Sequence, residues 1–268
     1  MPELPDLEVI KENLRKKILG FEVKGVHFLK KSSGKPSPEV IQEGLIGEKL
    51  VLVDRRGKFL KFGFKKGSLL LAHLMLEGQL EIKSSGEAPE KGTCAVIDFK
   101  EGNGLHFIDP RGWTKLFFYP AGKSGEPEEL ANLGPEPLSP EFTPEYFREG
   151  LRKLRGTLKM ALMEQEFISG IGNAYSDEIL FKAKISPLKP AKDLTEREKD
   201  LLFKCIKETL LWGIEETKTR MGEEVRGEIR EFLQVHRKEG QACPRCGTKI
   251  QRIEVEGRGT YFCPRCQR

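Results

Sequence analysis

Apolar residues recur at helical spacing near the start of the chain. Within residues 6–19 the repeat consists of Leu7, Ile10, Leu14 and Ile18. A period of three to four residues predicts an amphipathic helix over this range. Asp6 stands where a capping side chain is expected, and Gly20 follows the last apolar position. Such a helix would hold the first residues of the chain against a folded body.

Residues 21–119 consist of short runs rich in β-branched, aromatic and leucine residues. The runs, among them KLVLVD, KFLKFGF and TCAVIDF, are separated by clusters of Gly, Ser, Asn, Asp and Lys. Frequent short strands with turn signals and no helices between them predict an antiparallel β-sandwich or barrel.

The segment 120–140 is dense in Pro and Gly, which predicts a domain boundary. Beyond it the pattern is helical. The predicted helices cover 143–150, 151–165, 173–184 and a long run near 193–217. Thr195 precedes Glu198 by three residues, the spacing of a capping box. The charged segment 218–235 also has a helical pattern.

Composition places the chain among globular proteins. Of its 268 residues, 38% are hydrophobic and 32% are charged, which is too apolar for a disordered chain. The formal net charge of +5 fits a polyanionic partner but does not require one. The apolar stretch 69–76 is too short to span a bilayer, and the acidic start of the chain lacks a signal-peptide core. We therefore expect no membrane partner and a cytoplasmic location.

Four of the six cysteines follow the pattern C-x2-C-x16-C-x2-C. They are Cys243, Cys246, Cys263 and Cys266. Paired thiolates on two tight knuckles suit a tetrahedral Zn²⁺ site, and residues 249–262 between them read as a β-hairpin. An iron site, two disulfides or an unused pattern are the alternatives. A site with four protein ligands has no open position, so we predict one structural zinc ion. Cys94 and Cys205 are expected to be small core residues.

The chain opens Met1-Pro2-Glu3, a candidate reactive end. Removal of Met1 would leave Pro2 with a free secondary amine beside a carboxylate. An α-amino group titrates near pH ~7.7–8.0, so part of it is neutral and nucleophilic at physiological pH. Its attack on a sugar or carbonyl carbon would give an iminium, as in Schiff-base catalysis. The alternative is a terminus without function, because chain ends are usually loose.

Three more polar clusters stand at predicted turns. Arg55–Lys58 presents three cations around Gly57, either for a phosphate or simply to solvent. The run 170–178 (GIGNAYSDE) enters a helix and is either a phosphate seat or a plain helical hairpin. Asp109–Trp113 offers Arg111 and Trp113, which would stack in a nucleic-acid protein, whereas a tryptophan is more often buried in the core.

Together these segments resemble the formamidopyrimidine-DNA glycosylase family, which also contains endonuclease VIII. MPELPDLEVI is similar to the family's PELPEVE opening, and RRGKFL to its RRGKYL loop. HLMLEG stands where HLGMSG is usual, and DPRGWT where DPRRFG is usual. LGPEPLS, GIGNAYSDEILF and the terminal cysteine hairpin follow in the family's order.

The resemblance implies an α+β fold with two domains. The first would be an antiparallel β-sandwich with flanking helices over residues 1–134. The second would be a helix–two-turn–helix domain over 135–235 that carries a zinc-finger β-hairpin over 236–268. Damaged double-stranded DNA would bind between the domains of a monomer in the bacterial cytosol or nucleoid. The implied activity is a glycosylase and lyase that removes oxidised purines from a flipped nucleotide.

The family's catalytic roles then fall on matching positions. Pro2 would attack C1′ of the damaged nucleotide and form the Schiff base, and Glu3 would protonate the deoxyribose oxygen and move protons during β,δ-elimination. Lys58 would bind phosphates around the lesion and assist catalysis. Arg258, grouped with these catalytic residues, and Asn173 would grip the phosphates that flank the flipped nucleotide.

The resemblance also implies a DNA-binding set. Arg111 would fill the space that the flipped base leaves, Trp113 would wedge beside it, and Leu76 would replace the family's intercalating methionine. His73 and Arg155 complete this set. Gly112 replaces the second arginine of DPRRFG, which removes one cation.

The segment 218–235 looks shorter and more charged than the family's lesion-capping loop, so the choice of lesion stays open. One alternative is an oxidised-pyrimidine glycosylase like endonuclease VIII. A second is a non-catalytic DNA-binding protein built on the zinc hairpin and the helices. A third is an unrelated enzyme with an amino-terminal proline, such as a tautomerase.

Overall fold

The computed structural model describes residues 1–123 and 125–268 and divides them into two compact units. Unit 1 contains residues 1–130 and 217–229, and unit 2 contains residues 131–216 and 230–268. The chain thus returns to unit 1 for thirteen residues at the end of a long helix, α7 (Glu196–Met221). The predicted domain ranges 1–134, 135–235 and 236–268 stay predictions.

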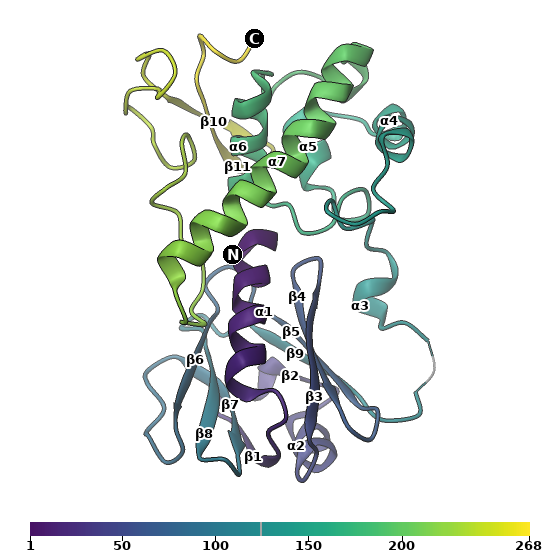
Figure 1. Ribbon diagram of the computed structural model, residues 1–268, viewed down its shortest axis with the longest axis vertical. Coiled ribbons are helices and arrows are strands. Elements are labelled where there is room, and N and C mark those ends of the chain that lie inside the picture. The colour runs from purple at the N-terminus through teal and green to yellow at the C-terminus, as the bar shows by residue number, and fades with distance from the viewer. Residues whose placement is uncertain (124) are drawn as a thin grey trace. The chain divides into compact units, whose positions relative to one another are not determined.

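Unit 1 is built from two β-sheets (Figure 1). The four-stranded sheet has the order β1-β7-β8-β6, and the five-stranded sheet has the order β2-β9-β5-β4-β3. The strands are β1 (Val23–Phe28), β2 (Gly34–Lys35), β3 (Leu50–Arg56), β4 (Phe59–Phe64), β5 (Leu69–His73), β6 (Gln79–Ser84), β7 (Thr93–Phe99), β8 (Asn103–Ile108) and β9 (Lys115–Tyr119). Phe62 of one sheet meets Phe107 of the other with ring centroids 6.4 Å apart, and both rings are buried. The predicted antiparallel β-sandwich with flanking helices is confirmed, with one parallel pair, β2 with β9.

The expectation that no helix interrupts the strands was wrong. A short helix, α2 (Pro38–Leu45), follows β2, after the 3-10 turn η1 (Lys31–Ser33). Ser37 caps α2 by accepting a hydrogen bond from the backbone N–H of Val40, and Pro38 occupies the first turn, where its missing N–H costs nothing. The Ser-Pro pair was the signal in the sequence.

Helix α1 (Leu4–Ile18) begins two residues before the predicted start. Its N-cap is Glu3 rather than Asp6, because Pro5 fits the first turn. The Asp6 carboxylate instead accepts a hydrogen bond from the backbone N–H of Glu3 at 2.8 Å. The predicted apolar face is buried throughout. This helix therefore fixes the first residues of the chain on unit 1.

Unit 2 consists of helices and a β-hairpin. After α3 (Glu128–Ala131), its elements are α4 (Pro144–Lys153), α5 (Leu158–Met163), α6 (Asn173–Ala183), the 3-10 turn η2 (Ala191–Asp193), most of α7, β10 (Gln251–Val255) and β11 (Arg258–Phe262). Thr195 and Glu198 form the predicted capping box at the start of α7. The single helix predicted over 151–165 is broken, because Gly156 has a φ of +90° and Thr157 caps a new helix.

The helix predicted over 218–235 was also wrong. The helix α7 ends at Met221, and Gly222 follows with a φ of +58°. Residues 222–235 contain turns, bends and irregular backbone but no helix. Within the described ranges, none of the helices is both long and apolar enough to cross a membrane.

Candidate functional site

The amino-terminal end of the chain lies in a cavity of unit 1. The cavity has a volume of about 550 Å³, and Pro2, Leu76 and Glu228 are among the residues that line it. Pro2 and Glu3 are buried at the start of α1, with Glu3 only 3% exposed. The terminal nitrogen of Met1 lies 2.6 Å from Oε2 of Glu228. The end of the chain is therefore held in place and is not a loose tail.

Lys58 is presented by the tight hairpin between β3 and β4. Arg56 pairs with Phe59, so Gly57 and Lys58 form a two-residue turn, and Gly57 has a φ of +56°. A positive φ at the first position is typical of Gly-X hairpin turns. The side chain of Arg55 braces the turn by donating to the Gly57 carbonyl at 3.0 Å and to Glu8 at 2.9 Å. Lys58 itself is buried, with 8% exposure, so its charge is not merely a solvated surface charge.

His73 connects this turn with the chain terminus. Burial, followed by the positive charges of Lys58 and the terminal ammonium, lowers the pKa of His73 to about 4. Its ring packs edge-on against Phe59, with centroids 4.7 Å apart, and its Nδ1 accepts a hydrogen bond from the Met75 backbone at 3.1 Å. Lys58, His73 and the amino terminus therefore share one neighbourhood, in which His73 is neutral at physiological pH.

The loop after β8 is organised by the buried carboxylate of Asp109. It accepts hydrogen bonds from the backbone N–H groups of residues 111–114 at 2.7 to 3.1 Å and from the Thr114 hydroxyl at 3.0 Å. Burial alone would raise the pKa of Asp109, but the hydrogen bonds from Thr114, Arg111 and Trp113 outweigh it and the pKa lies below its ordinary value. The loop is thereby fixed with its longer side chains outward.

Those outward side chains form an exposed apolar and cationic group. Trp113 is 39% exposed and Leu76 is 46% exposed. The guanidinium of Arg111 lies over the Trp113 ring at 5.0 Å and pairs with Glu77, the neighbour of Leu76, at 2.7 Å. Trp113 is thus not a core residue. Arg111 and Trp113 contact each other on unit 1, and the ion pair with Glu77 places Arg111 close to the chain at Leu76.

In unit 2, Asn173 and the tip of the zinc hairpin meet. Asn173 is the first residue of α6, and its Nδ2 donates to the carbonyl of Gly259 at 2.9 Å. Gly259 follows Arg258, which is exposed next to the two-residue turn Glu256-Gly257. Arg155 is exposed in the break between α4 and α5.

A buried chain of charges that the sequence reasoning missed supports the start of α6. Lys159 donates to the Asn173 carbonyl at 2.8 Å and to Asp177 at 2.6 Å, and Asp177 pairs with His236 at 2.7 Å. Lys159 and Asp177 are fully buried. A lysine and an aspartate on an amphipathic pattern read as surface positions, so nothing in the sequence distinguished them.

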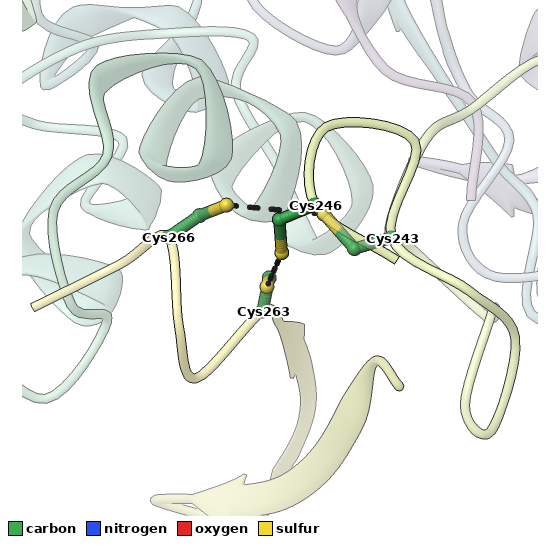
Figure 2. A group of neighbouring side chains, drawn as sticks. All are labelled: Cys243, Cys246, Cys263 and Cys266. Carbon is green, nitrogen blue, oxygen red and sulfur yellow. Dashed lines mark hydrogen bonds between the residues drawn. The ribbon is translucent and has the colours of Figure 1, made fainter. Parts of the chain in front are cut away.

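The four predicted cysteine ligands form one cluster (Figure 2). All four sulfur atoms lie within 4.8 Å of one another. Each cysteine of one knuckle faces a cysteine of the other: Cys246 lies 3.5 Å from Cys263, and Cys243 lies 3.9 Å from Cys266. Such a set of thiolates fits a tetrahedral Zn²⁺ ion. Cys94 and Cys205 are buried, as expected. The hairpin packs on α6 through Phe181, and Arg245 donates to the Phe181 carbonyl at 2.5 Å.

Known proteins share this arrangement over the whole chain. Family models match residues 1–116 (formamidopyrimidine-DNA glycosylase N-terminal domain), 133–224 (formamidopyrimidine-DNA glycosylase H2TH domain) and 240–268 (zinc finger found in FPG and IleRS). The formamidopyrimidine-DNA glycosylase of Pelotomaculum thermopropionicum is 36% identical over 274 residues, which cover 100% of this chain and 99% of the relative. The chain belongs to the formamidopyrimidine-DNA glycosylase family. Its two-domain fold and its zinc finger are those of the family.

Further members of the formamidopyrimidine-DNA glycosylase family are similar to this chain over nearly its whole length. The Thermus thermophilus enzyme of that name is 36% identical over 275 residues, which cover 100% of this chain and 98% of the relative. A Lactococcus lactis structure in complex with DNA containing FAPY-dG superposes with a TM-score of 0.91 at 33% identity, covering 99% of this chain and 100% of that one. A second structure from the same organism, bound to DNA containing an abasic site, gives 0.88 at 31% identity over 99% of both chains.

The structure groups the expected site residues by unit. Unit 1 holds Pro2, Glu3, Lys58, His73, Leu76, Arg111 and Trp113, and unit 2 holds Arg155, Asn173 and Arg258. Sequence reasoning missed Glu228, because its segment had been interpreted as a helix. The Gly at position 222, directly after the last apolar turn of α7, was the available signal for a helix end.

Proposed function

We propose that this protein is a DNA glycosylase and AP lyase of base excision repair that removes oxidised purines from double-stranded DNA. The observation that carries the proposal is the buried Pro2–Glu3 end in a cavity of unit 1, in the neighbourhood of Lys58 and neutral His73. Relatives that match the full chain are named for formamidopyrimidine-DNA glycosylase activity, and solved relatives are bound to DNA containing a lesion or an abasic site.

The chemistry begins at the processed amino terminus. With Met1 removed, the lone pair of the Pro2 nitrogen forms a bond to C1′ while the bond from C1′ to the base breaks. The attacking nitrogen loses its N–H proton and the departing base takes up a proton. Glu3 protonates the ring oxygen, and the sugar opens as the nitrogen lone pair forms an iminium with C1′. The iminium then acts as the electron sink: loss of a proton from C2′ breaks the bond to the 3′ phosphate, and loss of a proton from C4′ then breaks the bond to the 5′ phosphate. Lys58 neutralises charge on a phosphate beside the lesion.

The remaining residues hold and open the duplex. Asn173, Arg258 and Arg155 of unit 2 bind backbone phosphates. Contacts of this kind set the register of a protein on the duplex. Leu76, Arg111 and Trp113 occupy the space of the flipped nucleotide, since apolar and stacking side chains compensate for the lost base stacking. His73 adds an uncharged polar contact to this surface.

Borohydride trapping on DNA with an abasic site tests the mechanism, because the reagent reduces the iminium to a stable covalent adduct. We expect the wild-type protein to be trapped and Pro2→Gly to be trapped at least about 100-fold more slowly. A protein that keeps Met1 or carries a tag ahead of Pro2 should give no adduct. Binding without trapping in the wild type would support the non-catalytic alternative. Equal trapping of Pro2→Gly would remove Pro2 from its role.

Oxidised pyrimidines are the second candidate substrate class. Segment 222–229 supports this candidate. It stands at the place of the family's lesion-capping loop and forms an irregular, charged wall of the Pro2 cavity. One Lactococcus lactis relative at 32% identity was solved with DNA containing an oxidised pyrimidine. Excision of 8-oxoguanine measured against thymine glycol and dihydrouracil separates the two substrate classes.

We infer that the protein acts as a monomer in the bacterial cytosol or nucleoid, since the matching relatives are bacterial.

An activity that requires no DNA would support the alternative of a tautomerase-like enzyme.

A further inference from the structure

Residues 222–229 are fixed to unit 1 and form part of its surface. Nδ2 of Asn13, on α1, donates to the carbonyls of Gly222 at 2.8 Å and Glu224 at 2.7 Å. Asn13 is only 4% exposed, so these hydrogen bonds are largely shielded from water. A buried amide that satisfies two backbone carbonyls holds their segment firmly, because breaking either bond leaves a desolvated polar group.

Two further contacts attach the same segment to β6. Arg226 forms an ion pair with Glu81 at 2.6 Å, and the side chain of Glu81 is only 13% exposed. A Cβ atom on Gly227 would lie 3.2 Å from Cγ of Gln79 and 3.4 Å from the carbonyl oxygen of Gly78, so the segment runs close to the start of β6. Val225, which lies between Glu224 and Arg226 in the chain, is buried. The segment is therefore a preformed wall of the cavity that contains Pro2.

Glu228 extends from this wall to the start of the chain. Its Oε2 atom lies 2.6 Å from the terminal nitrogen, and the two side chains are about one-quarter exposed. Removal of Met1 would move the terminal charge to Pro2, which lines the same cavity as Glu228. Successive Cα atoms are about 3.8 Å apart, a distance that rotation of the glutamate side chain can cover.

We propose that Glu228 is a positioning residue that holds the processed Pro2 amine for attack on the sugar. A neutral proline amine has one N–H and one lone pair. When the N–H donates to a carboxylate fixed on the cavity wall, the lone pair is directed to the other side of the nitrogen. Orientation of this kind matters because a misplacement of about 1 Å can cost a reaction about 100-fold. The proposal rests on the function proposed above.

The test compares Glu228→Gln, Glu228→Asp and the matched control Glu223→Gln. Glu223 lies in the same segment, but its side chain is 88% exposed and pairs only loosely with Lys17, at 3.7 Å. For each protein, intact mass verifies removal of Met1. Single-turnover borohydride trapping on an abasic site gives the rate, and titration with DNA containing a tetrahydrofuran abasic analogue gives the affinity.

We expect Glu228→Gln to slow trapping at least about 10-fold while its affinity for the analogue stays within about twofold of the wild type. Glu228→Asp should recover part of the rate, and Glu223→Gln should match the wild type. A wild-type trapping rate in Glu228→Gln, or a loss in proportion to affinity, overturns the role of Glu228 while leaving Pro2 in place. Failure of the wild type to be trapped, or full trapping of Pro2→Gly, overturns both proposals.

Discussion

At the scale of single residues, Asp109 shows how one buried carboxylate shapes a whole loop. Its five hydrogen bonds come from four consecutive backbone N–H groups and one hydroxyl. This arrangement leaves Arg111 and Trp113 facing outward, where they contact each other. The polar interior of the loop thus produces the exposed wedge.

Asp109→Asn should destabilise the protein by about 1–3 kcal/mol near pH 6, because an amide turns an N–H₂ group toward backbone donors. The folded pKa of Asp109 lies below its ordinary value, so the carboxylate stabilises the fold above the unfolded pKa of about 3.9. That contribution is lost as the pH falls through the lower folded pKa. Urea unfolding at pH 6 and pH 3.5 measures the free energy of unfolding of the wild type and of Asp109→Asn. The difference between the two proteins should be smaller at pH 3.5. A gap that is the same at both pH values would contradict this account.

At the scale of elements, short turns determine where the charged groups lie. The β3–β4 hairpin has only two residues at its tip, and Gly57 adopts a φ of +56° there. Lys58 follows directly and is buried, and its charge, like that of the amino terminus, lowers the pKa of His73. The position of the lysine therefore depends on the backbone of the glycine before it.

Gly57→Val should lower the stability by about 1–2 kcal/mol, because a β-branched residue is strained at positive φ. It should also displace Lys58 and slow trapping at least about 10-fold. Gly57→Asn is the control, since asparagine tolerates this conformation, and it should keep most of the rate. Thermal unfolding and borohydride trapping measure the two effects. Equal rates for valine and asparagine would show that the turn conformation does not place Lys58.

At the scale of the whole molecule, the two units carry different parts of the proposed work. Unit 1 contains the proposed reactive end and the proposed wedge, and unit 2 contains Asn173, Arg155 and the zinc hairpin with Arg258. The hairpin depends on the cysteine cluster, because Cys243 and Cys263 belong to the small core that packs it on α6. The cysteine cluster and Arg258, the proposed phosphate contact, therefore belong to one hairpin of unit 2.

Removal of zinc, by chelation or by Cys246→Ser, should unfold the hairpin and weaken duplex binding at least about 10-fold, since a structural zinc site supplies folding free energy. Fluorescence anisotropy with a labelled duplex measures the affinity, and a colorimetric zinc assay measures the metal. Cys205→Ser is the control because Cys205 lies in α7 outside the cluster. Zinc-free protein that binds duplex as tightly as the wild type would refute the link.

Duplex binding should also depend steeply on salt. If about four phosphates are neutralised, affinity should fall on the order of 100-fold between 50 and 200 mM KCl. Arg258→Gln should reduce the slope of log Kd against log salt by about one, because one phosphate contact is lost. A flat titration would contradict an interface dominated by phosphates.

Local chemistry determined what could be recognised in the sequence by itself. The spacing of the four cysteines, the glycine of the Arg55–Lys58 turn and the Pro2–Glu3 start each depend on residues close together in the chain, as metal knuckles and tight turns do. The short strands separated by turn signals likewise predicted an antiparallel sandwich or barrel, and the family resemblance favoured the sandwich. These features could be singled out as candidates because their physical requirements are met within a few residues.

Only the tertiary structure decided the features that join distant residues. Glu228 meets the amino terminus across 227 positions, and Asn13 holds the carbonyls of residues 222 and 224 from α1. The charge pattern over 218–235 predicted a helix. It could not show that the buried side-chain amide of Asn13 accounts for the hydrogen bonds of two carbonyls in this segment, so that no helix is needed there. Trp113 was equally ambiguous until the hydrogen bonds of Asp109 fixed its loop. In each case the deciding free energy comes from burial and pairing with a distant partner, which local patterns do not encode.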